Sequence, residues 1–282
     1  MPELPEVETI KYGLTKLILK KSVVKITTFC EKSLIGNAKQ VENHKIINIS
    51  RRGKALLIEL QDNLWLMIHL RMTGQLIYVG QTKFAAGHPD ANFTAKMPSP
   101  HTRVIFEFND GSHLYFNDQR KFGFVKIATT SELKTDKFLA KLAPEPWEIT
   151  PEEFFEKLTR RKNTTIKAAI LDQTIVAGVG NIYADESLFY AKIFPGQKVA
   201  TISFAQAKKL LEGIRQTMED SINSGGSTLK DYVQVDGAKG DYLSKFAKIF
   251  NRTGQKCFVC GATIIKTRVA GRGTHFCPRC QK

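Results

Sequence analysis

The sequence of 282 residues lacks the features that would place it in a membrane, in a secreted disulfide scaffold or in a repeat array. No apolar run reaches the roughly 18 residues that a transmembrane helix needs. Only five cysteines occur, and no internal repeat is visible. With 42% hydrophobic and 24% charged residues, the chain has an ordinary globular composition, and its length allows two domains and a small module.

The N-terminus lacks the apolar core of a signal peptide. It begins Met1-Pro2-Glu3 and is acidic rather than basic, so we expect no secretion signal and a cytoplasmic location. A reducing compartment also suits the cysteines, of which Cys30 stands alone in the first half of the chain.

Acidic residues are absent from the last part of the chain, between Tyr242 and Lys282. The basic residues there are Lys245, Lys248, Arg252, Lys256, Lys266, Arg268, Arg272, Arg279 and Lys282. The whole chain has a formal net charge of +15 and a pI near 9.6. Such a positive field attracts a polyanion, and nucleic acid is the partner we expect. A solvated basic surface and an anionic membrane are the alternatives, but no basic amphipathic helix supports membrane binding.

Four of the five cysteines form two pairs near the C-terminus, spaced C-x2-C-x16-C-x2-C. They are Cys257, Cys260, Cys277 and Cys280. This spacing is typical of a zinc site in which four thiolates bind one ion and leave no open position for a substrate. We therefore predict one structural Zn²⁺, which stabilises a hairpin too small to fold on its own core. Two unrelated pairs or a redox dithiol would be the alternative.

Hydrophobic periodicity predicts a helix followed by a β-rich region in the first half of the chain. Residues 5–20 place apolar side chains at helical spacing, and Pro5 suits the first turn. Short β-branched and aromatic segments follow at 23–26, 46–49, 55–60, 64–70, 103–108, 113–116 and 124–127. Turn residues separate them, which predicts a sandwich or barrel. Residues 81–101 are rich in glycine, proline and polar residues and predict a long loop.

The second half of the chain is helical in character. Thr150 with Glu153 and Ser203 with Gln206 form capping boxes, and we expect helices at 151–160, 165–173, 182–191 and 204–222. The predicted order is a β-rich domain at 1–132, a linker at 133–150, a helical domain at 151–245 and a zinc finger at 246–282. The fold class is therefore α+β, with two domains and a finger.

The N-terminal segment offers a nucleophile, Pro2, beside two carboxylates. Removal of Met1 would make Pro2 a terminal secondary amine. An α-amine with a pKa near 8 is about 10% neutral at pH 7, against roughly 0.04% for an ordinary lysine. A neutral amine can attack a sugar C1′ and form an iminium, while Glu3 or Glu6 transfers protons. The alternative is that these carboxylates only cap the first helix.

Six motifs, in order along nearly the whole chain, resemble those of the bacterial formamidopyrimidine-DNA glycosylases. They are Met1–Thr9 (MPELPEVET), Arg51–Lys54 (RRGK), His69–Gly74 (HLRMTG), Asp118–Gly123 (DQRKFG), Val179–Glu186 (VGNIYADE) and Ala270–Cys277 (AGRGTHFC). The resemblance implies a repair enzyme that binds damaged double-stranded DNA. It would excise 8-oxoguanine and formamidopyrimidines and then cleave the abasic strand by β,δ-elimination. We expect a monomer, associated with the bacterial nucleoid when on DNA.

The same resemblance implies a fold and a set of catalytic residues. The fold is an N-terminal β-sandwich with an N-terminal helix, followed by a helix–two-turns–helix domain that carries a zinc β-hairpin finger. Pro2 is the expected nucleophile, which forms a Schiff base with the deoxyribose. Glu3 is the expected acid that assists ring opening, Glu6 is a supporting carboxylate, and Lys54 binds phosphate at the damage site.

Further residues are expected to bind DNA. By resemblance, Asn181 and Arg272 grip the phosphates that flank the lesion, so that Arg272 belongs with the catalytic set as well. His69 and Lys167 are expected phosphate contacts. The loop at 225–240, which includes Ser227, resembles the segment that closes over an extruded purine.

Three more residues are expected to fill the hole that an extruded base leaves in the duplex. An enzyme that acts on a base must extrude it, and an apolar wedge with a polar partner for the orphaned base can occupy the gap. By resemblance, Met72 and Phe122 are the wedge, and Arg120 faces the widowed cytosine. Ordinary packing at strand ends is the alternative for Met72 and Phe122.

The chain departs from the family pattern at a few positions. Asn251 stands where relatives usually have glycine, and Lys256 replaces a common proline. The predicted 81–101 loop is also longer than usual.

Two other functions compete with this interpretation. One is an oxidised-pyrimidine glycosylase of the endonuclease VIII type, against which Leu4 and the set of Met72, Arg120 and Phe122 argue. The other is a non-catalytic zinc-ribbon nucleic-acid binder, which explains the charge and the finger but not the carboxylates beside Pro2.

Overall fold

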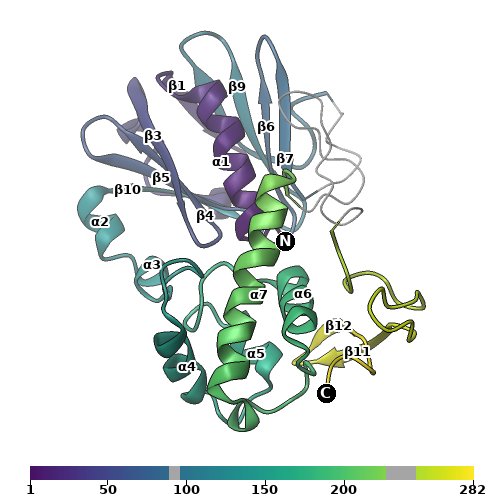
Figure 1. Cartoon of the computed structure of the whole chain (residues 1–282). Helices are drawn as coiled ribbons and strands as arrows, with labels where there is room; N and C mark the ends of the chain where they lie inside the picture. Colours follow the sequence, from purple (N-terminus) through teal and green to yellow (C-terminus); the bar gives the residue numbers. More distant parts are fainter. Residues whose placement is uncertain (89–95, 227–245) are drawn as a thin grey trace. The chain divides into compact units, whose positions relative to one another are not determined.

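The computed structural model describes residues 1–88, 96–226 and 246–282 (Figure 1). The chain divides into two compact units: among the described residues, unit 1 is built from Met1–Ala140 with 224–226, and unit 2 from Lys141–Asn223 with 246–282. Most of the predicted loop at 225–240 lies outside the described residues, and so do Ser227, Thr228, Tyr232 and Lys245. No helix in the described parts of the chain is long and apolar enough to cross a membrane.

Helix α1 (Leu4–Ile18) opens unit 1 and confirms the predicted helical period. Pro5 lies in its first turn, where a missing backbone N–H costs nothing. Its apolar face buries Val7, Ile10, Leu14 and Ile18, each no more than 2% exposed. Burial of each such side chain contributes about 1.5–3 kcal/mol before the entropy of ordering is subtracted.

Ten strands follow the helix in the part of unit 1 that the structure describes. They are β1 (Ser22–Thr28), β2 (Leu34–Ile35), β3 (His44–Arg52), β4 (Ala55–Leu60), β5 (Leu64–His69), β6 (Gly74–Val79), β7 (Lys83–Gly87), β8 (Thr102–Phe108), β9 (His113–Asp118) and β10 (Phe124–Thr129). Their hydrogen-bonded order is β2-β10-β5-β4-β3-β1-β8-β9-β6-β7. All neighbours pair antiparallel except β2 with β10.

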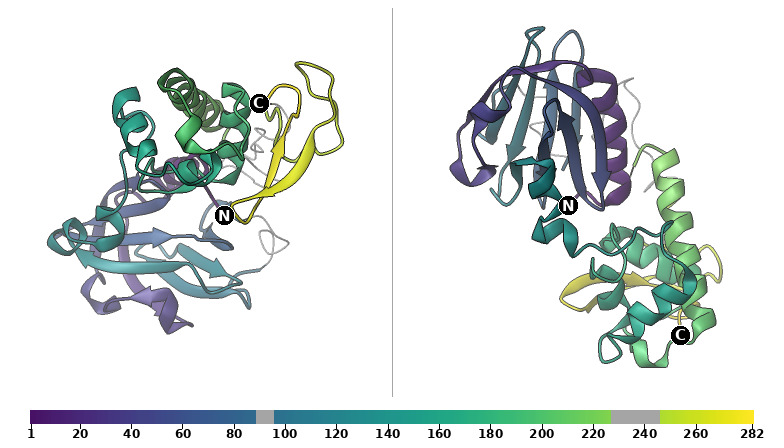
Figure 2. Two further views of the ribbon diagram at one scale, coloured as in Figure 1. Left: turned by 90° about the horizontal axis from the view of Figure 1, so that it is seen from below. Right: turned by 90° about the vertical axis from the view of Figure 1, so that its left-hand side faces the viewer.

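The two halves of this strand order share one core, which confirms the predicted sandwich. Ile58 and Ile68 come from the half around β4 and β5, while Leu76 and Phe106 come from the half around β8 and β6. All four lie in one buried cluster together with the apolar face of α1. The two layers are visible in Figures 1 and 2.

The expected loop at 81–101 is wrong for its first part, because residues 83–87 form strand β7. β7 pairs with β6, a strand that the sequence periodicity had not indicated. Phe84 is 2% exposed and lies against Gly13 of α1, where an added Cβ would come within 2.5 Å of the ring. Glycine at this position therefore allows the helix to approach the sheet.

Two short helices end unit 1, and four longer ones build unit 2. They are α2 (Thr130–Lys134), α3 (Lys137–Ala140), α4 (Pro151–Thr159), α5 (Ile166–Leu171), α6 (Asn181–Ala191) and α7 (Phe204–Asn223). Single turns of 3₁₀ helix occur at Glu31–Ser33, Ala38–Gln40 and Val199–Thr201. Both predicted capping boxes are present: Glu153 N–H donates to Thr150 Oγ1, and Gln206 N–H donates to Ser203 Oγ, each at 3.2 Å.

A β-hairpin of β11 (Ile265–Val269) and β12 (Arg272–Phe276) completes the finger of unit 2. Val269 pairs with Arg272, so the turn has two residues, Ala270 and Gly271. Both have positive φ, of 49° and 73°, as a two-residue hairpin turn that matches strand twist requires. The hairpin therefore presents Arg272 directly beside its tip.

Candidate active site and nucleic-acid interface

The start of α1 brings the predicted nucleophile and carboxylates to one buried corner of unit 1. Pro2 is buried and Glu3 is only 3% exposed. The Glu6 carboxylate accepts a hydrogen bond from the backbone N–H of Glu3 at 2.8 Å, which is half of a capping box. These residues therefore do cap the first helix, as the alternative interpretation holds. The same cap also fixes both carboxylates beside the chain terminus.

The terminal amine at this corner is held toward its neutral form. Burial is the main cause that lowers the pKa of the Met1 amine from its ordinary value of 8.0, and the Lys54 charge acts in the same direction. Glu3 and Glu6 oppose the shift by stabilising the ammonium, but they do not outweigh it. An amine with a lowered pKa is more often unprotonated at neutral pH, which is the form that attacks carbon.

Lys54 occupies a two-residue turn between β3 and β4. Arg52 pairs with Ala55, so only Gly53 and Lys54 form the turn, and Gly53 has a φ of 56° that favours glycine. Lys54 is 7% exposed. Its charge lowers the pKa of both the Met1 amine and His69. The neighbouring Ala55 pairs directly with His69 across β4 and β5.

His69 ends β5 as a neutral imidazole. Burial, followed by the charges of Arg71 and Lys54, lowers its pKa from 6.5 to about 3. Its Nδ1 accepts a hydrogen bond from the Arg71 N–H at 3.1 Å, so the ring proton belongs on Nε2. The ring stacks on Phe124 and meets Phe138 edge-on, with centroids 5.9 and 5.4 Å away. His69 can therefore offer a neutral N–H donor to a phosphate oxygen.

The three predicted void-filling residues lie on two loops of unit 1. Met72, on the loop between β5 and β6, is half-buried, and Phe122, on the loop between β9 and β10, is 56% exposed. The Arg120 guanidinium lies over the Phe122 ring, 4.8 Å from its centroid. Ordinary core packing therefore does not account for Phe122, whereas Met72 is partly packed.

In unit 2, Asn181 and Arg272 lie close to one another. Asn181 is the first residue of α6, and its Nδ2 donates to the carbonyl of Gly273 at 3.1 Å. Gly273 follows Arg272 on β12, and the Arg272 side chain is exposed. The turn before α6 is fixed by Gln173, which accepts from Gly178 N–H at 2.9 Å and donates to the Val179 carbonyl at 2.9 Å. The start of a helix carries a positive partial charge, which favours phosphate.

The contacts of Lys167 differ from those expected of a phosphate-binding residue. It is 0% exposed, and its Nζ donates to Asp185 at 2.6 Å, to Thr274 at 2.8 Å and to the Gly273 carbonyl at 3.2 Å. Asp185 also accepts from the His275 N–H at 2.8 Å. Lys167 therefore joins α5, α6 and β12 around a buried carboxylate, and its contact with phosphate stays a prediction.

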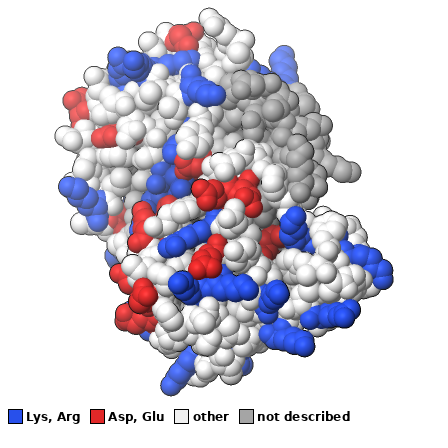
Figure 3. All heavy atoms as spheres, in the orientation of Figure 1, with Lys and Arg blue, Asp and Glu red and all other residues white. Residues whose placement is uncertain are grey.

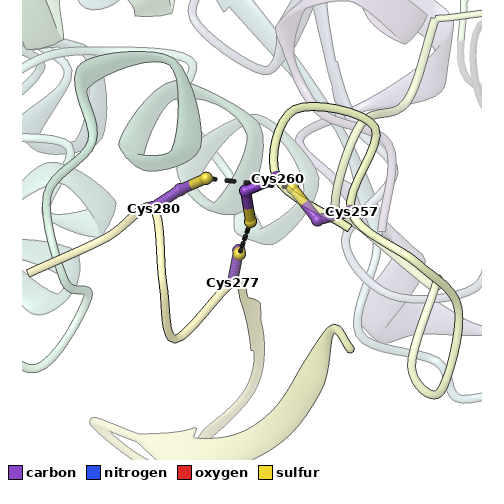
Figure 4. Close-up of side chains that lie close together, drawn as sticks. All are labelled: Cys257, Cys260, Cys277 and Cys280. Carbon is purple, nitrogen blue, oxygen red and sulfur yellow. Dashed lines mark hydrogen bonds between the residues drawn. The ribbon is translucent and has the colours of Figure 1, made fainter. Parts of the chain in front are cut away.

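The four cysteines of the finger form a site for one structural zinc ion (Figure 4). Their Sγ atoms all lie within 4.8 Å of one another, and those of Cys260 and Cys277 are 3.4 Å apart. A tetrahedron with Zn–S bonds of about 2.3 Å has S–S edges of about 3.8 Å. The 3.9 Å between Cys257 and Cys280 matches this edge, so the donor set fits zinc.

Two side chains anchor the finger to α6. The buried Glu186 carboxylate accepts from the backbone N–H groups of Lys248, Ile249 and Phe250 at 2.7–2.9 Å. At the other end, Gln281 Nε2 donates to the carbonyl of Ile193, just after α6, at 3.0 Å. These bonds fix the finger relative to α6, which carries Asn181.

The departure at Asn251 has a local explanation. Its φ is 59°, in the left-handed region where glycine is most at ease and asparagine is among the best tolerated alternatives. Asparagine therefore preserves the turn into the finger.

The described face of the molecule in Figure 3 has lysine and arginine side chains over the finger, in line with its lack of acidic residues. Basic residues that give the sequence its positive charge are thus exposed on this face. Phosphate groups bind to such surfaces mainly through charge, which positions a duplex without reading its sequence.

Sequence reasoning gave no role to three buried carboxylates, Asp118, Asp185 and Glu186. Each lies inside a motif quoted for the family resemblance, and each is no more than 2% exposed. The only signal in the sequence was an acidic residue next to a predicted strand or helix end, which is too common to single out.

Comparison with known proteins covers the chain in three consecutive parts. Residues 1–125 match the formamidopyrimidine-DNA glycosylase N-terminal domain. Residues 142–233 match the formamidopyrimidine-DNA glycosylase H2TH domain, and residues 254–282 match the zinc finger found in FPG and IleRS.

Curated relatives match along their whole length. The formamidopyrimidine-DNA glycosylase of Desulfitobacterium hafniense is 38% identical over 288 residues, with 100% of both chains covered. The enzyme of the same name from Geobacillus kaustophilus is 39% identical over 292 residues, again with 100% of both covered.

Solved structures agree with these matches. A Lactococcus lactis FPG variant in complex with DNA containing Fapy-dG has a TM-score of 0.88 at 33% identity, with 100% of both chains covered. The Lactococcus lactis Fpg bound to DNA with an abasic site also has a TM-score of 0.88, at 33% identity over 99% of each chain. The MutM (FPG) protein of Thermus thermophilus has a TM-score of 0.86 at 34% identity, with 99% and 98% covered.

Proposed function

This chain belongs to the formamidopyrimidine-DNA glycosylase family of DNA repair enzymes, and we propose that it excises oxidised purines through a covalent intermediate on Pro2. The substrate is duplex DNA that contains 8-oxoguanine or a formamidopyrimidine. The match along the entire chain argues against a non-catalytic zinc-ribbon binder, whose resemblance would stop at the finger.

The observation that carries the proposal is the buried terminal corner. Removal of Met1 leaves the Pro2 nitrogen as the terminal amine, in surroundings that already lower the pKa of the Met1 amine. The neutral nitrogen attacks C1′, the glycosidic bond breaks, and the base leaves with the bonding electrons. The Pro2 nitrogen gives up its single N–H proton after the attack, so ring opening then gives an iminium that has no N–H left to lose and is permanently cationic.

The carboxylates have separate tasks in this chemistry. Glu3, buried next to Pro2, protonates O4′ as the C1′–O4′ bond opens. Glu6 holds the backbone of Glu3 through the capping hydrogen bond, which supports a positioning task for Glu6. The cationic iminium then draws electrons from C2′, so that β-elimination expels the 3′ phosphate and δ-elimination expels the 5′ phosphate.

Phosphate groups of the damaged strand meet donors in each unit. In unit 1, Lys54 offers a charge and His69 a neutral Nε2–H. In unit 2, Asn181 and Arg272 offer an amide and a guanidinium beside the start of α6. Lys167 supports this second set by holding Gly273 and Thr274 in place.

Met72, Arg120 and Phe122 occupy the space of the extruded nucleotide. Unstacking a base costs a few kcal/mol, and apolar side chains between the neighbouring base pairs recover part of that cost. The Arg120 guanidinium has only donors, which suits the acceptor atoms of an orphaned cytosine. We further propose that the enzyme acts as a monomer in the bacterial cytoplasm. Light scattering of the protein with and without duplex would test whether it is a monomer.

The substrate assignment is tested with a panel of lesion duplexes treated with borohydride. We expect rapid excision and a trapped adduct with 8-oxoguanine opposite cytosine, and much slower reaction with thymine glycol. Preference for thymine glycol would instead place the enzyme with the endonuclease VIII type. A preparation that retains Met1 should bind the same duplexes but neither cleave them nor form the adduct.

A further inference from the structure

Asp118 is a fully buried carboxylate to which the proposed chemistry gives no task. It ends β9 and is 0% exposed. Its own backbone is fixed to the neighbouring strand region, because its N–H donates to the His101 carbonyl and its carbonyl accepts from Arg103 Nε, at 2.9 and 2.8 Å. A charge buried this deeply is expensive unless its oxygens are fully used, so its partners identify its role.

The partners of Asp118 lie on both void-filling loops. Its Oδ2 accepts from the backbone N–H of Gly123 at 2.7 Å, and its Oδ1 accepts from the N–H of Arg120 at 3.1 Å. The Thr73 hydroxyl, on the loop that carries Met72, donates to Oδ1. The same hydroxyl accepts from the Arg120 N–H at 3.0 Å. One carboxylate and one hydroxyl thus join two loops that are 45 residues apart in sequence.

The backbone of each loop is held in an uncommon conformation immediately before its wedge residue. Arg71 precedes Met72 with a φ of 50°, and Lys121 precedes Phe122 with a φ of 58°. A non-glycine residue is strained in the left-handed region, so the surroundings must hold it there. The hydrogen bonds of Asp118 and Thr73 flank both positions, and the His69 ring also accepts from the Arg71 N–H.

The tips of the loops are exposed although their bases are fixed. Phe122 is 56% exposed with the Arg120 guanidinium on its ring, so the side chains that would enter DNA are already arranged without it. Ordering such side chains only on binding would cost conformational entropy at the moment when the base is extruded. Fixing the loops in advance removes part of that cost.

We propose that Asp118 and Thr73 form a latch that holds the two void-filling loops in register, so that Met72 enters the duplex together with Arg120 and Phe122. The inference rests on the proposed function, because it assigns positioning residues to the same site. Both are positioning residues, since Asp118 is buried and acts through the backbone of its neighbours. The latch should matter only where a base must leave a duplex and a partner base is left behind.

Thr73→Val and Thr73→Ser form a matched pair that tests the latch. Valine keeps the shape of threonine but removes the hydroxyl, whereas serine keeps the hydroxyl. Two substrates separate the tasks: a duplex with 8-oxoguanine opposite cytosine needs void filling, and a single strand with an abasic site needs only the Pro2 chemistry. Amide hydrogen exchange at Arg120 reports on the latch itself, because that N–H bonds to both Thr73 and Asp118.

We expect Thr73→Val to lower the single-turnover rate on the duplex by about tenfold and to accelerate exchange at Arg120, while cleavage of the single strand is unchanged. Thr73→Ser should behave as the wild type. The preference for cytosine over adenine opposite the lesion should also shrink in Thr73→Val, because Arg120 is less fixed. Asp118→Asn should show a larger loss on the duplex, since its amide cannot accept on both sides.

Three results would overturn the latch. Thr73→Val could match the wild type on the duplex, it could lose both reactions to the same degree, or it could leave the exchange at Arg120 unchanged. A wild-type enzyme that reacts with neither substrate would instead overturn the function on which the latch rests.

Discussion

The Glu8 carboxylate on α1 and the Arg51 guanidinium on β3 are joined by a nearly buried ion pair, with 2.5 Å between Oε2 and Nε. Their side chains are only 9% and 10% exposed. Arg51 lies three residues before Lys54, so the pair ties the helix that begins beside Pro2 to the turn that carries Lys54.

Replacing Glu8 with glutamine should destabilise unit 1 by about 1–3 kcal/mol, because it removes the carboxylate that pairs with both Arg51 and Lys11. Burial raises the pKa of Glu8, but hydrogen bonds and charges from Lys11 and Arg51 outweigh burial and lower it below its ordinary 4.5. The stabilisation is therefore complete above about pH 4.5 and is lost as the pH falls through the lowered folded pKa. Urea unfolding at pH 7 and near pH 3 measures both effects.

The difference in the free energy of unfolding between wild type and Glu8→Gln should thus be smaller near pH 3 than at pH 7. A difference that is constant over this range, or that grows on acidification, would contradict the pair. Glu31→Gln, at an exposed residue of the same unit, is the control and should change little.

His69 should remain neutral through the whole working range of the enzyme. Its pKa is lowered to about 3, mainly by burial. The ring C–H resonances of His69 should therefore not shift between pH 5 and pH 8. A titration midpoint of His69 above about pH 5 would show that the ring can be charged at this position.

Lys167 and Arg272 should differ in the salt dependence of DNA binding. Loss of a phosphate contact lowers the slope of log K against log salt by about 1. We expect this change for Arg272→Gln, because the arginine is exposed, and no change for Lys167→Met, whose ammonium is bonded to Asp185. Lys167→Met should instead lower stability, and Lys167→Met with Asp185→Asn should recover part of it.

A reduced salt slope for Lys167→Met would support its predicted contact with phosphate. An unchanged slope for Arg272→Gln would remove Arg272 from the phosphate-binding set.

Cys260→Ser should lose zinc and bind duplex weakly, while the sandwich of unit 1 stays folded. Three thiolates cannot complete the tetrahedral site, and without the ion the short hairpin has too little core to hold Arg272. Elemental analysis gives the zinc content, fluorescence anisotropy gives the affinity, and Cys30→Ser is the matched control. Retained zinc or unchanged affinity in Cys260→Ser would contradict this role of the finger.

The zinc site, the first helix and both capping boxes could be predicted from the sequence, because each depends on residues close together in the chain. The spacing of Cys257 and Cys260 sets their geometry, and Thr150 reaches Glu153 within one helical turn. Strand β7 could not be predicted in this way. Its sequence Lys83–Gly87 is rich in alanine and glycine, and it is a strand because it pairs with β6 and buries Phe84 against α1.

The role of the buried carboxylates could not be predicted from the sequence, because it too depends on contacts between distant segments. Acidic residues are exposed in most proteins, so only tertiary structure reveals that Asp118 and Asp185 are enclosed by donors from distant segments. For Lys167, the family resemblance implied a phosphate contact, and only the fold shows that Asp185 and β12 surround its ammonium.

The central claim is that the amine exposed by loss of Met1 is the nucleophile. Mass spectrometry of the borohydride-trapped adduct with a duplex carrying 8-oxoguanine opposite cytosine tests it most directly. We predict that the deoxyribose remnant is attached to the Pro2 nitrogen at the mature N-terminus, and that the adduct is absent when Met1 is retained. A remnant on Lys54, or on any other lysine, would contradict the account.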